Sequence, residues 1–228
     1  VHAFTTTRRG GESAGRFSSL NLAMHVGDNE AAVATNRKLL RNACDLPQEP
    51  RWLQQEHGVH LVAAEEYTGT PADACYATTP NALCAILTAD CLPVLLCDQR
   101  ATIVVAMHAG WRGLFHGIIR QTLQALALPG AQWLAWLGPA IGANAYAVGA
   151  DLRAQFVDAD PRLAVCFARR DEMWFADLSG IASRQLADAG ISRIDRYHGC
   201  TAGERQRFFS YRRDGVCGRM ASVIWLSR

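Results

Sequence analysis

Residues 83–113, LCAILTADCLPVLLCDQRATIVVAMHAGWRG, form the stretch around which we expect the fold to be organised. Two apolar runs inside it, Leu92–Cys97 and Ala101–Met107, have the length and composition of buried strands. The polar residues Asp98–Arg100 separate the two runs and predict a turn. The pattern therefore predicts a buried strand pair at the centre of the molecule.

Reactive side chains lie at the ends of this strand pair. Asp90 and Cys91 fall between two apolar runs, and His108 opens the glycine-rich segment HAGWRG directly after a strand. Taken alone, a buried cysteine is usually inert and a histidine beside a strand is usually a hydrogen-bonded structural residue. Strand ends on a rigid scaffold can nevertheless hold chemistry, so the pair becomes a candidate site if a third group joins it.

Length and composition limit the classes of protein to which the chain can belong. The chain has 228 residues, of which 50% are apolar and 19% charged, with a formal net charge of +2. This balance argues against a disordered chain and against a nucleic-acid partner. No repeat, linker or low-complexity tract interrupts the sequence, and a single domain over residues 1–228 is expected.

The eight cysteines show no CxxC pair, which favours reduced thiols and a cytoplasmic protein over a disulfide framework. No apolar run approaches the length of a membrane span, and no signal peptide is visible, so we expect no membrane association.

Outside the central stretch, periodicity and breakers predict further elements. The expected helices are Asn29–Cys44 with Asp28 as N-cap, Leu114–Leu128, Gly149–Val157 and Leu178–Ala189. The expected strands are Ala3–Thr7, Arg51–Gln55, Val59–Glu65, Trp133–Leu137, Leu163–Ala168, Met173–Ala176 and Ile191–Tyr197, followed by a closing hairpin of Gln206–Arg212 and Val216–Leu226 across Asp214-Gly215.

The third group comes from the segment EHGVH, which contains His57 and His60. In an extended segment these two side chains point to opposite faces, so only one can face a given site, and spacing does not decide which. Together with Cys91 and His108, one of them would complete a set of two imidazoles and one thiolate. That set suits catalytic zinc, which keeps three protein ligands and an open position. Three unrelated buried residues remain the alternative.

Seven segments of the chain have the character of family signature blocks: FTTTRRGGESAGRFSSLNLAMHVGD, AVATNRKLL, QQEHG, TADCLPVLL, HAGWRG, GPAIGANAYAVG and FFSYRRDGVCGRMASVIWL. They resemble those of the laccase-domain (YfiH-like) family, also described as multifunctional purine nucleoside phosphorylases. They cover nearly the whole chain, and TADC followed by HAGWRG at this distance is specific. One departure is Gln55-Glu56 before His57, where the family more often has an apolar residue.

The resemblance implies an α+β fold, a four-layer α/β/β/α sandwich of two sheets flanked by helices. It also implies that His57, Cys91 and His108 are zinc ligands and catalytic residues. The implied activities are phosphorolysis of adenosine, inosine, guanosine and methylthioadenosine, and deamination of adenosine. Purine nucleosides and phosphate would be the small-molecule partners of a protein that we expect to be a monomer.

Other side chains are candidates for substrate binding. Asp90 could carry a proton or could brace its loop. Arg112, at the start of a helix after a glycine-containing loop, suits phosphate, and Arg212 is a further candidate from the last predicted hairpin, with Arg213 and Arg219 as rivals.

Three other functions use the same sequence features. A Cys–His hydrolase would use Cys91 as nucleophile and His108 as base without a metal. A role in editing peptidoglycan precursors is attached to bacterial members of the family. A copper polyphenol oxidase of the laccase type is disfavoured, because the chain has seven histidines and no HxH pair.

Overall fold

The predicted central strand pair is present, and it lies in the middle of a six-stranded sheet. The computed structural model describes residues 1–227. β5 (Leu92–Asp98) pairs antiparallel with β6 (Val104–Ala109), with Leu95 opposite Ala106. Both strands are buried on both faces, which explains why they read as continuous apolar runs rather than as alternating patterns.

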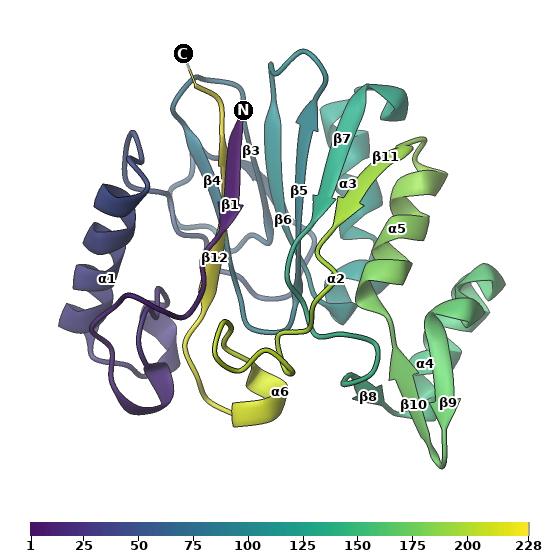
Figure 1. The fold of residues 1–228 in the computed structure, drawn as a ribbon. Coiled ribbons are helices and arrows are strands. Elements are labelled where there is room, and N and C mark those ends of the chain that lie inside the picture. Colours follow the sequence, from purple (N-terminus) through teal and green to yellow (C-terminus); the bar gives the residue numbers. More distant parts are fainter. Residues whose placement is uncertain (228) are drawn as a thin grey trace.

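The six-stranded sheet extends from this pair in both directions (Figure 1). Its order is β11 (Arg193–Arg196), β7 (Trp133–Leu137), β5, β6, β3 (Ala74–Ala77) and β2 (Leu61–Ala63). The two edge pairs, β11–β7 and β2–β3, are parallel, and the inner pairs are antiparallel.

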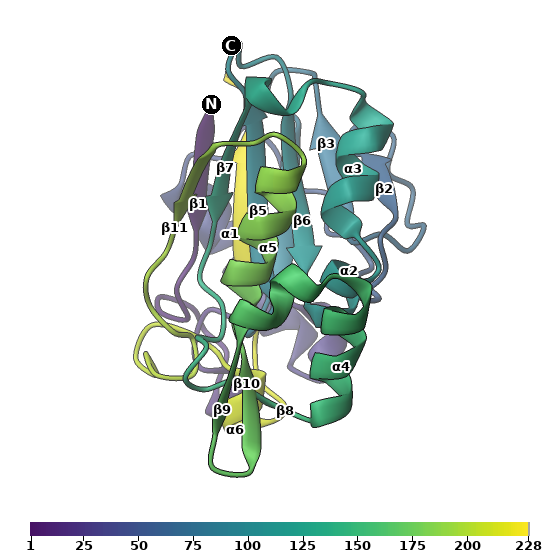
Figure 2. The same ribbon diagram turned by 90° about the vertical axis from the view of Figure 1, so that its right-hand side faces the viewer.

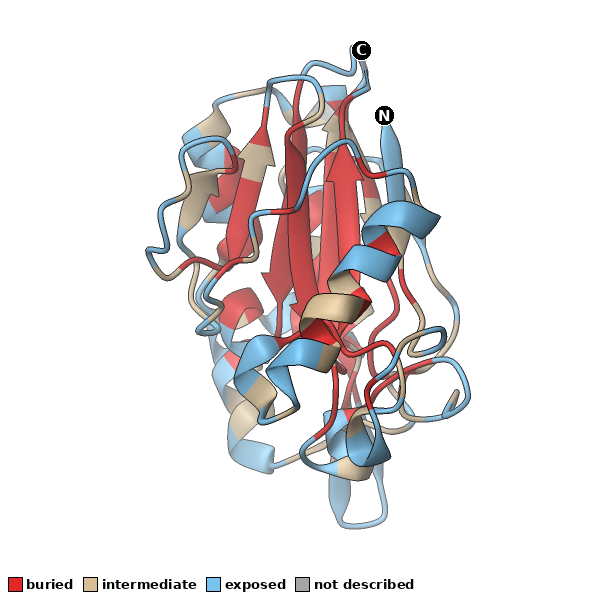
Figure 3. Cartoon of the chain, turned by 90° about the vertical axis from the view of Figure 1, so that its left-hand side faces the viewer, coloured by how far each residue is buried: buried red, intermediate tan, exposed pale blue. Residues whose placement is uncertain are grey.

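A second sheet packs face to face against the first. It has the order β1 (His2–Thr5), β12 (Met220–Trp225) and β4 (Leu83–Thr88), all antiparallel. Ile86 and Ile224 from this sheet meet Leu95 and Ala106 from the larger one in a buried apolar layer. Figure 3 shows these central strands almost wholly buried.

Helices cover the two outer faces and complete four layers (Figures 1 and 2). The α-helices are α1 (Glu30–Ala43), α2 (Trp111–Phe115), α3 (Ile118–Leu126), α4 (Ala150–Ala159), α5 (Leu178–Asp188) and α6 (Tyr211–Asp214), and the 3-10 helices are η1 (Gly15–Phe17), η2 (Met24–Val26), η3 (Gly130–Gln132) and η4 (Pro161–Cys166). α1 packs on the smaller sheet, whereas α2, α3 and α5 pack on the larger one. The four-layer α+β sandwich that the resemblance implied is confirmed.

A small antiparallel sheet projects beside α4. It consists of β8 (Ala147–Val148), β10 (Met173–Ala176) and β9 (Phe167–Arg170). Most of the predicted strand Leu163–Ala168 is 3-10 helix here, because Pro161 and the Asp160 side chain, which accepts a hydrogen bond from the Arg162 amide, start a tight helical turn.

Two predicted helices differ from the observed ones at their ends or in their continuity. Asn29, not Asp28, caps α1, since its side chain accepts a hydrogen bond from the Ala32 amide. The single helix predicted over Leu114–Leu128 is two helices, because Gly117 adopts a left-handed conformation (φ +79°) that ends α2 and precedes α3.

The predicted closing hairpin is wrong in its first arm. The Ser210 side chain accepts a hydrogen bond from the Arg213 amide and starts the single-turn helix α6, which Gly215 ends at φ +66°. The second arm becomes β12, whose partners β1 and β4 are distant in sequence. Such pairing is invisible to a rule based on local turns.

Two predictions fail in the region before β4. Residues 51–55 form no strand, because Gln55 satisfies the backbone of Leu87 through its side chain, donating to the carbonyl and accepting from the amide, both at 2.8 Å. β3 was not predicted, although it joins β2 to β6. Within the described part of the chain, no helix has the length and apolar character that crossing a bilayer requires.

Candidate active site

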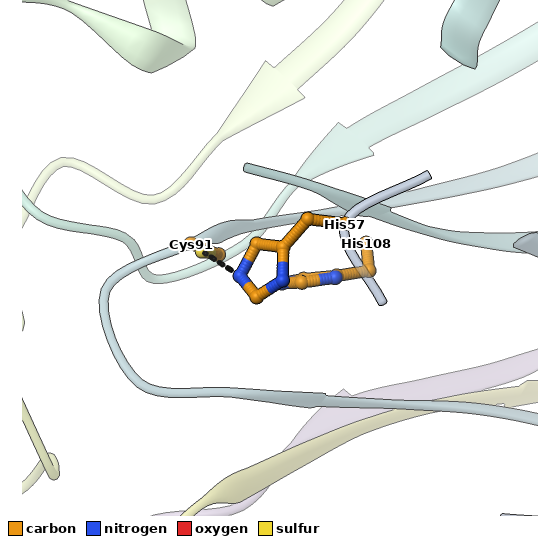
Figure 4. A group of neighbouring side chains, drawn as sticks. All are labelled: His57, Cys91 and His108. Carbon is orange, nitrogen blue, oxygen red and sulfur yellow. Dashed lines mark hydrogen bonds between the residues drawn. The ribbon is translucent and has the colours of Figure 1, made fainter. Parts of the chain in front are cut away.

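His57, Cys91 and His108 meet where three segments of the two sheets end. His57 lies in the loop before β2, Cys91 in the connection from β4 to β5, and His108 near the end of β6. One ligand atom from each lies within 4.8 Å of the others. The Cys91 Sγ to His57 Nε2 distance is 3.9 Å, and the two imidazole rings are 4.7 Å apart at 67°. Figure 4 shows the three side chains converging on one point. We call them the ligand trio.

Asp73 is hydrogen-bonded to both histidines of the ligand trio. Its side chain is fully buried and accepts hydrogen bonds from the amides of Glu56 (3.1 Å), His57 (3.0 Å) and Gly58 (2.6 Å). It also accepts one from His108 Nδ1 at 2.7 Å. This bond directs His108 Nε2 toward the trio, and the amide bonds fix a loop in which His57 has a φ of +65°. One carboxylate therefore positions two imidazoles.

The sequence analysis did not single out Asp73. The segment PADACYA carries one signal, a single acid directly before an apolar strand. Nothing local shows that the carboxylate would face His108, because the contact depends on the pairing of β3 with β6, where Ala74 lies opposite Met107.

Gly110 leaves the space that the Cys91 sulfur fills. A Cβ atom at this position would lie 2.9 Å from Cys91 Sγ and 3.4 Å from His57 Cδ2. The φ of Gly110 is −66°, which any residue can adopt, so the requirement for glycine is one of space and not of backbone conformation.

Opposite charges on Cys91 and His108 stabilise each other. Burial raises the pKa of the Cys91 thiol, but the charge and hydrogen bond of His108, followed by those of His57, lower it to about 6. Burial lowers the pKa of His108, but the Cys91 thiolate and Asp73 raise it to about 9. At neutral pH the sulfur is a thiolate, which is the form that binds metals and attacks electrophiles.

A cavity of about 390 Å³ opens over the ligand trio. This volume falls in the range of small-molecule sites. Three arginines, three aromatic residues and a further histidine contribute to its wall. The lining residues are His25, Gln55, His57, Leu87, Thr88, Ala89, Asp90, Cys91, His108, Trp111, Arg112, Ile141, Tyr146, Tyr211, Arg212 and Arg219.

Asp90 lines the cavity, but its carboxylate is engaged with the protein. It accepts hydrogen bonds from the Thr201 hydroxyl (2.6 Å), the Ser210 hydroxyl (3.0 Å) and the Arg212 amide (2.6 Å). Its backbone carbonyl accepts a further bond from the amide of Ile141. These bonds favour the bracing role over the proton-carrying role, since Asp90 joins the Cys91 loop to the start of α6.

The candidate arginines divide into two groups. Arg112, Arg212 and Arg219 line the cavity, with Arg112 stacked 4.6 Å from the Trp111 ring and Arg212 4.9 Å from the Tyr146 ring. Arg213 is not part of the lining, because its guanidinium donates to the carbonyls of Thr201, Ala202 and Phe208 and to Asp214. Among the arginines proposed from the sequence, Arg213 is the one whose guanidinium is fully engaged in hydrogen bonds within the protein.

Tyr146 is a donor that the sequence did not single out. It lines the same cavity as Arg112 and Arg212. Burial, followed by the charge of Cys91, raises its pKa to about 12 despite the opposing charges of Arg212 and Arg112. The hydroxyl is therefore protonated at neutral pH and can donate a hydrogen bond to a ligand in the cavity.

His60 lies outside the ligand trio. Its Nδ1 is 2.8 Å from the carbonyl oxygen of Pro71, and its side chain is exposed. The structure thus brings His57, and not His60, to Cys91 and His108.

The ligand trio fits a metal ion by donor chemistry and by spacing. Donor atoms of a tetrahedral zinc site lie roughly 3.3–3.8 Å apart, which follows from zinc bond lengths of about 2.0–2.3 Å. The observed separations of up to 4.8 Å need only a small closure. Asp73 gives His108 the carboxylate partner that is typical of metal-binding imidazoles.

A family model described as multi-copper polyphenol oxidoreductase laccase matches residues 2–227. The chain belongs to this family. The resemblance found in the sequence is thereby confirmed, and the match spans almost the full length of the chain.

Members of the laccase family that resemble this chain carry the name of a nucleoside enzyme. The protein named purine nucleoside phosphorylase YfiH of Escherichia coli (strain K12) is 45% identical over 228 residues, covering 99% of this chain and 94% of the relative. The protein named purine nucleoside phosphorylase of Haemophilus influenzae is 44% identical over 230 residues, with 99% and 94% covered.

Solved structures share the laccase-family fold described above. The crystal structure of a Neisseria meningitidis protein matches with a TM-score of 0.93 and 44% identity, covering 99% of this chain and 94% of that one. YlmD from Geobacillus stearothermophilus matches with a TM-score of 0.91 and 31% identity, covering 99% and 92%.

The family's description mentions copper, and the donor set of the ligand trio suits either copper or zinc. A multicopper oxidase needs several copper centres. Among residues 1–227, the ligand trio is the one group of three or more histidine, cysteine or acidic side chains placed to hold a metal.

Proposed function

We propose that this protein is a zinc-dependent enzyme that acts on purine nucleosides, with His57, Cys91 and His108 as metal ligands. The observation that carries the proposal is the ligand trio in a cavity whose wall holds Arg112, Arg212 and Arg219. The names of the relatives in Escherichia coli and Haemophilus influenzae support purine nucleosides and phosphate as substrates.

A zinc ion held by the trio would supply Lewis-acid chemistry for water or for a phosphate oxygen. The side chains of this protein then have separate tasks. Asp73 orients the two imidazoles, Arg112 and Arg212 bind the phosphate, and Tyr146 donates a hydrogen bond to the substrate. Trp111 and Ile141 give the wall an apolar surface against which a purine can lie.

The proposed reactions are phosphorolysis of adenosine, inosine, guanosine and methylthioadenosine, and deamination of adenosine. We further propose a single domain over residues 1–228, acting as a cytoplasmic monomer with no nucleic-acid partner.

The first prediction concerns metal content. Purified protein is expected to hold about one zinc per chain, and Cys91→Ala and His57→Ala are each expected to lose most of it, because three ligands and their charge define the site. His60→Ala is the matched control, since that imidazole contacts Pro71 instead of the trio. Elemental analysis of protein prepared without chelators provides the measurement, and equal losses in the His57 and His60 variants would contradict the ligand assignment.

The second prediction separates the two reactions. Adenosine is expected to give inosine without phosphate, whereas free base should appear only when phosphate is added. Arg112→Met should depress phosphorolysis about tenfold to a hundredfold, because a lost charge-assisted hydrogen bond costs roughly 1.5–3 kcal/mol. Deamination should change far less. Arg120→Met, on α3 outside the cavity, is the control, and chromatography of reactions with and without phosphate gives both rates.

If no purine product forms either with or without phosphate, the nucleoside proposal is refuted. Parallel losses of both reactions in the Arg112 variant would remove its specific role in binding phosphate.

A Cys–His hydrolase is the second candidate, and one observation favours it. The pKa values of about 6 for Cys91 and about 9 for His108 describe a thiolate–imidazolium pair, which is the ionic form of a cysteine nucleophile with its base. Full activity of protein that contains no metal would select this candidate over the zinc enzyme.

A further inference from the structure

Three guanidinium groups and one carboxylate line the cavity. The guanidinium groups belong to Arg112, Arg212 and Arg219, and Asp90 is the one acidic lining residue in the described chain. The carboxylate oxygens of Asp90 accept hydrogen bonds from hydroxyls and a backbone amide, and not from any of these guanidinium groups. The three arginines are therefore not paired with the acidic residue of their own cavity.

None of the three cavity arginines has a carboxylate partner in the described chain. Six arginines in the described chain lie within 4.0 Å of a carboxylate: Arg8, Arg162, Arg169, Arg205, Arg207 and Arg213. Arg112, Arg212 and Arg219 form no such pair within residues 1–227. Unpaired guanidinium groups that share a cavity repel one another, so an anionic ligand would relieve a real electrostatic cost.

The three arginines reach the cavity from different parts of the fold. Arg112 comes from α2, which packs on the six-stranded sheet, and Arg212 comes from α6 and contacts Tyr146. Arg219 directly precedes β12 in the three-stranded sheet. Its guanidinium donates to the carbonyls of Cys217 (2.7 Å) and Gly218 (3.1 Å) through one nitrogen, which leaves the other donors of the fork available.

Arg219 contacts a different part of the cavity wall from Arg112 and Arg212. Its guanidinium lies 6.0 Å from the ring of Tyr211, whereas Arg112 stacks on Trp111 and Arg212 on Tyr146. His25 also lines the cavity, and burial, followed by the charges of Arg219 and Arg37, lowers its pKa. A neutral His25 adds hydrogen-bonding capacity beside Arg219 without adding another charge.

We propose that the cavity also takes purine nucleoside 5′-monophosphates, with the phosphate of the nucleotide bound by Arg219 and the nucleoside directed toward the ligand trio. This inference rests on the proposed function for the orientation of the nucleoside, and it widens the substrate class from nucleosides to nucleotides. Charge complementarity carries it, because an inorganic phosphate bound by Arg112 and Arg212 leaves Arg219 without an anionic partner, and the phosphate of a nucleotide supplies one.

The test is calorimetric titration of zinc-loaded protein with inosine, inosine 5′-monophosphate and inorganic phosphate, each alone. The nucleotide is expected to bind about tenfold to a hundredfold more tightly than inosine, and the difference should shrink as salt is raised. Arg219→Met should reduce the ratio of nucleotide affinity to inosine affinity by a similar factor, and Arg219→Lys, which keeps the charge, should recover part of it. Arg207→Met, whose partner is Glu204, should leave the ratio unchanged.

Equal affinities for inosine and its 5′-monophosphate in the parent protein would overturn the inference. So would a preference for nucleotide that survives Arg219→Met in protein that still melts cooperatively. Binding of inorganic phosphate that depends on Arg219, without any gain from a phosphate on the nucleoside, would assign Arg219 to free phosphate and also overturn it. Binding is measured without turnover, so a protein that binds the nucleotide through Arg219 yet converts no nucleoside refutes the proposed reaction and not this inference.

Discussion

Asp73→Asn is expected to lower both zinc affinity and turnover by about tenfold to a hundredfold, as is usual when the carboxylate behind a metal-binding imidazole is lost. One Asp73 oxygen accepts from the His57 amide and His108 Nδ1, and the other accepts from the amides of Glu56 and Gly58. An asparagine side chain presents an NH₂ group to one of these two pairs in either orientation. Donors then face donors, and at least one imidazole loses its position.

Asp98→Asn is a suitable control for the general effect of removing a buried aspartate. Asp98 is also buried, and it accepts hydrogen bonds from the amides of Thr102 and Ile103 at the turn between β5 and β6. Both variants should be less stable to denaturant, but only Asp73→Asn should lose zinc and activity. Zinc stoichiometry and kcat with adenosine measure the difference. Similar losses of zinc and activity in the two variants would show that Asp73 has only a structural role.

The sequence predicted best where local pattern and tertiary environment agree. The β5–β6 pair is buried and β7 alternates buried with half-buried residues, and the composition of these strands allows little besides a strand. Prediction from the sequence failed where a side chain took the place of a backbone hydrogen-bond partner, as Gln55 does for Leu87. It also failed where one glycine, Gly117, divided a helical pattern into two helices. In those places the deciding contact comes from outside the local window.

In the candidate site, the sequence identified some of the reactive residues but not how they are arranged in space. Cys91 and His108 are recognisable because reactive residues follow apolar strands, but the choice of His57 over His60 came only from the family resemblance. Asp73 and Tyr146 were not found, because an acid or a phenol in a loop gives no local signal of what it will face. The cavity arginines could be named but not sorted, since the partners of Arg213 are carbonyls that only the folded chain brings to it.

Gly110→Ala is expected to reduce turnover by about a hundredfold while leaving the fold intact. The added methyl group would lie 2.9 Å from Cys91 Sγ, closer than carbon and sulfur can approach, and 3.4 Å from His57 Cδ2. The backbone at φ −66° accepts alanine, so the strain must be relieved by moving the thiolate or the imidazole. A misplacement of about 1 Å at a reacting centre can cost about a hundredfold in rate.

Gly203→Ala provides the matched control for this prediction, because a Cβ atom there would meet its nearest neighbours at 3.7 Å or more, and the backbone is again compatible with alanine. Thermal melting should be nearly the same for both variants, whereas zinc content and kcat should fall only in Gly110→Ala. A Gly110→Ala variant with a full complement of zinc and unchanged kcat would show that the sulfur of Cys91 need not stay where the structure places it. In that case Cys91 would not be a fixed ligand, and the geometric argument for the ligand trio would fail with it.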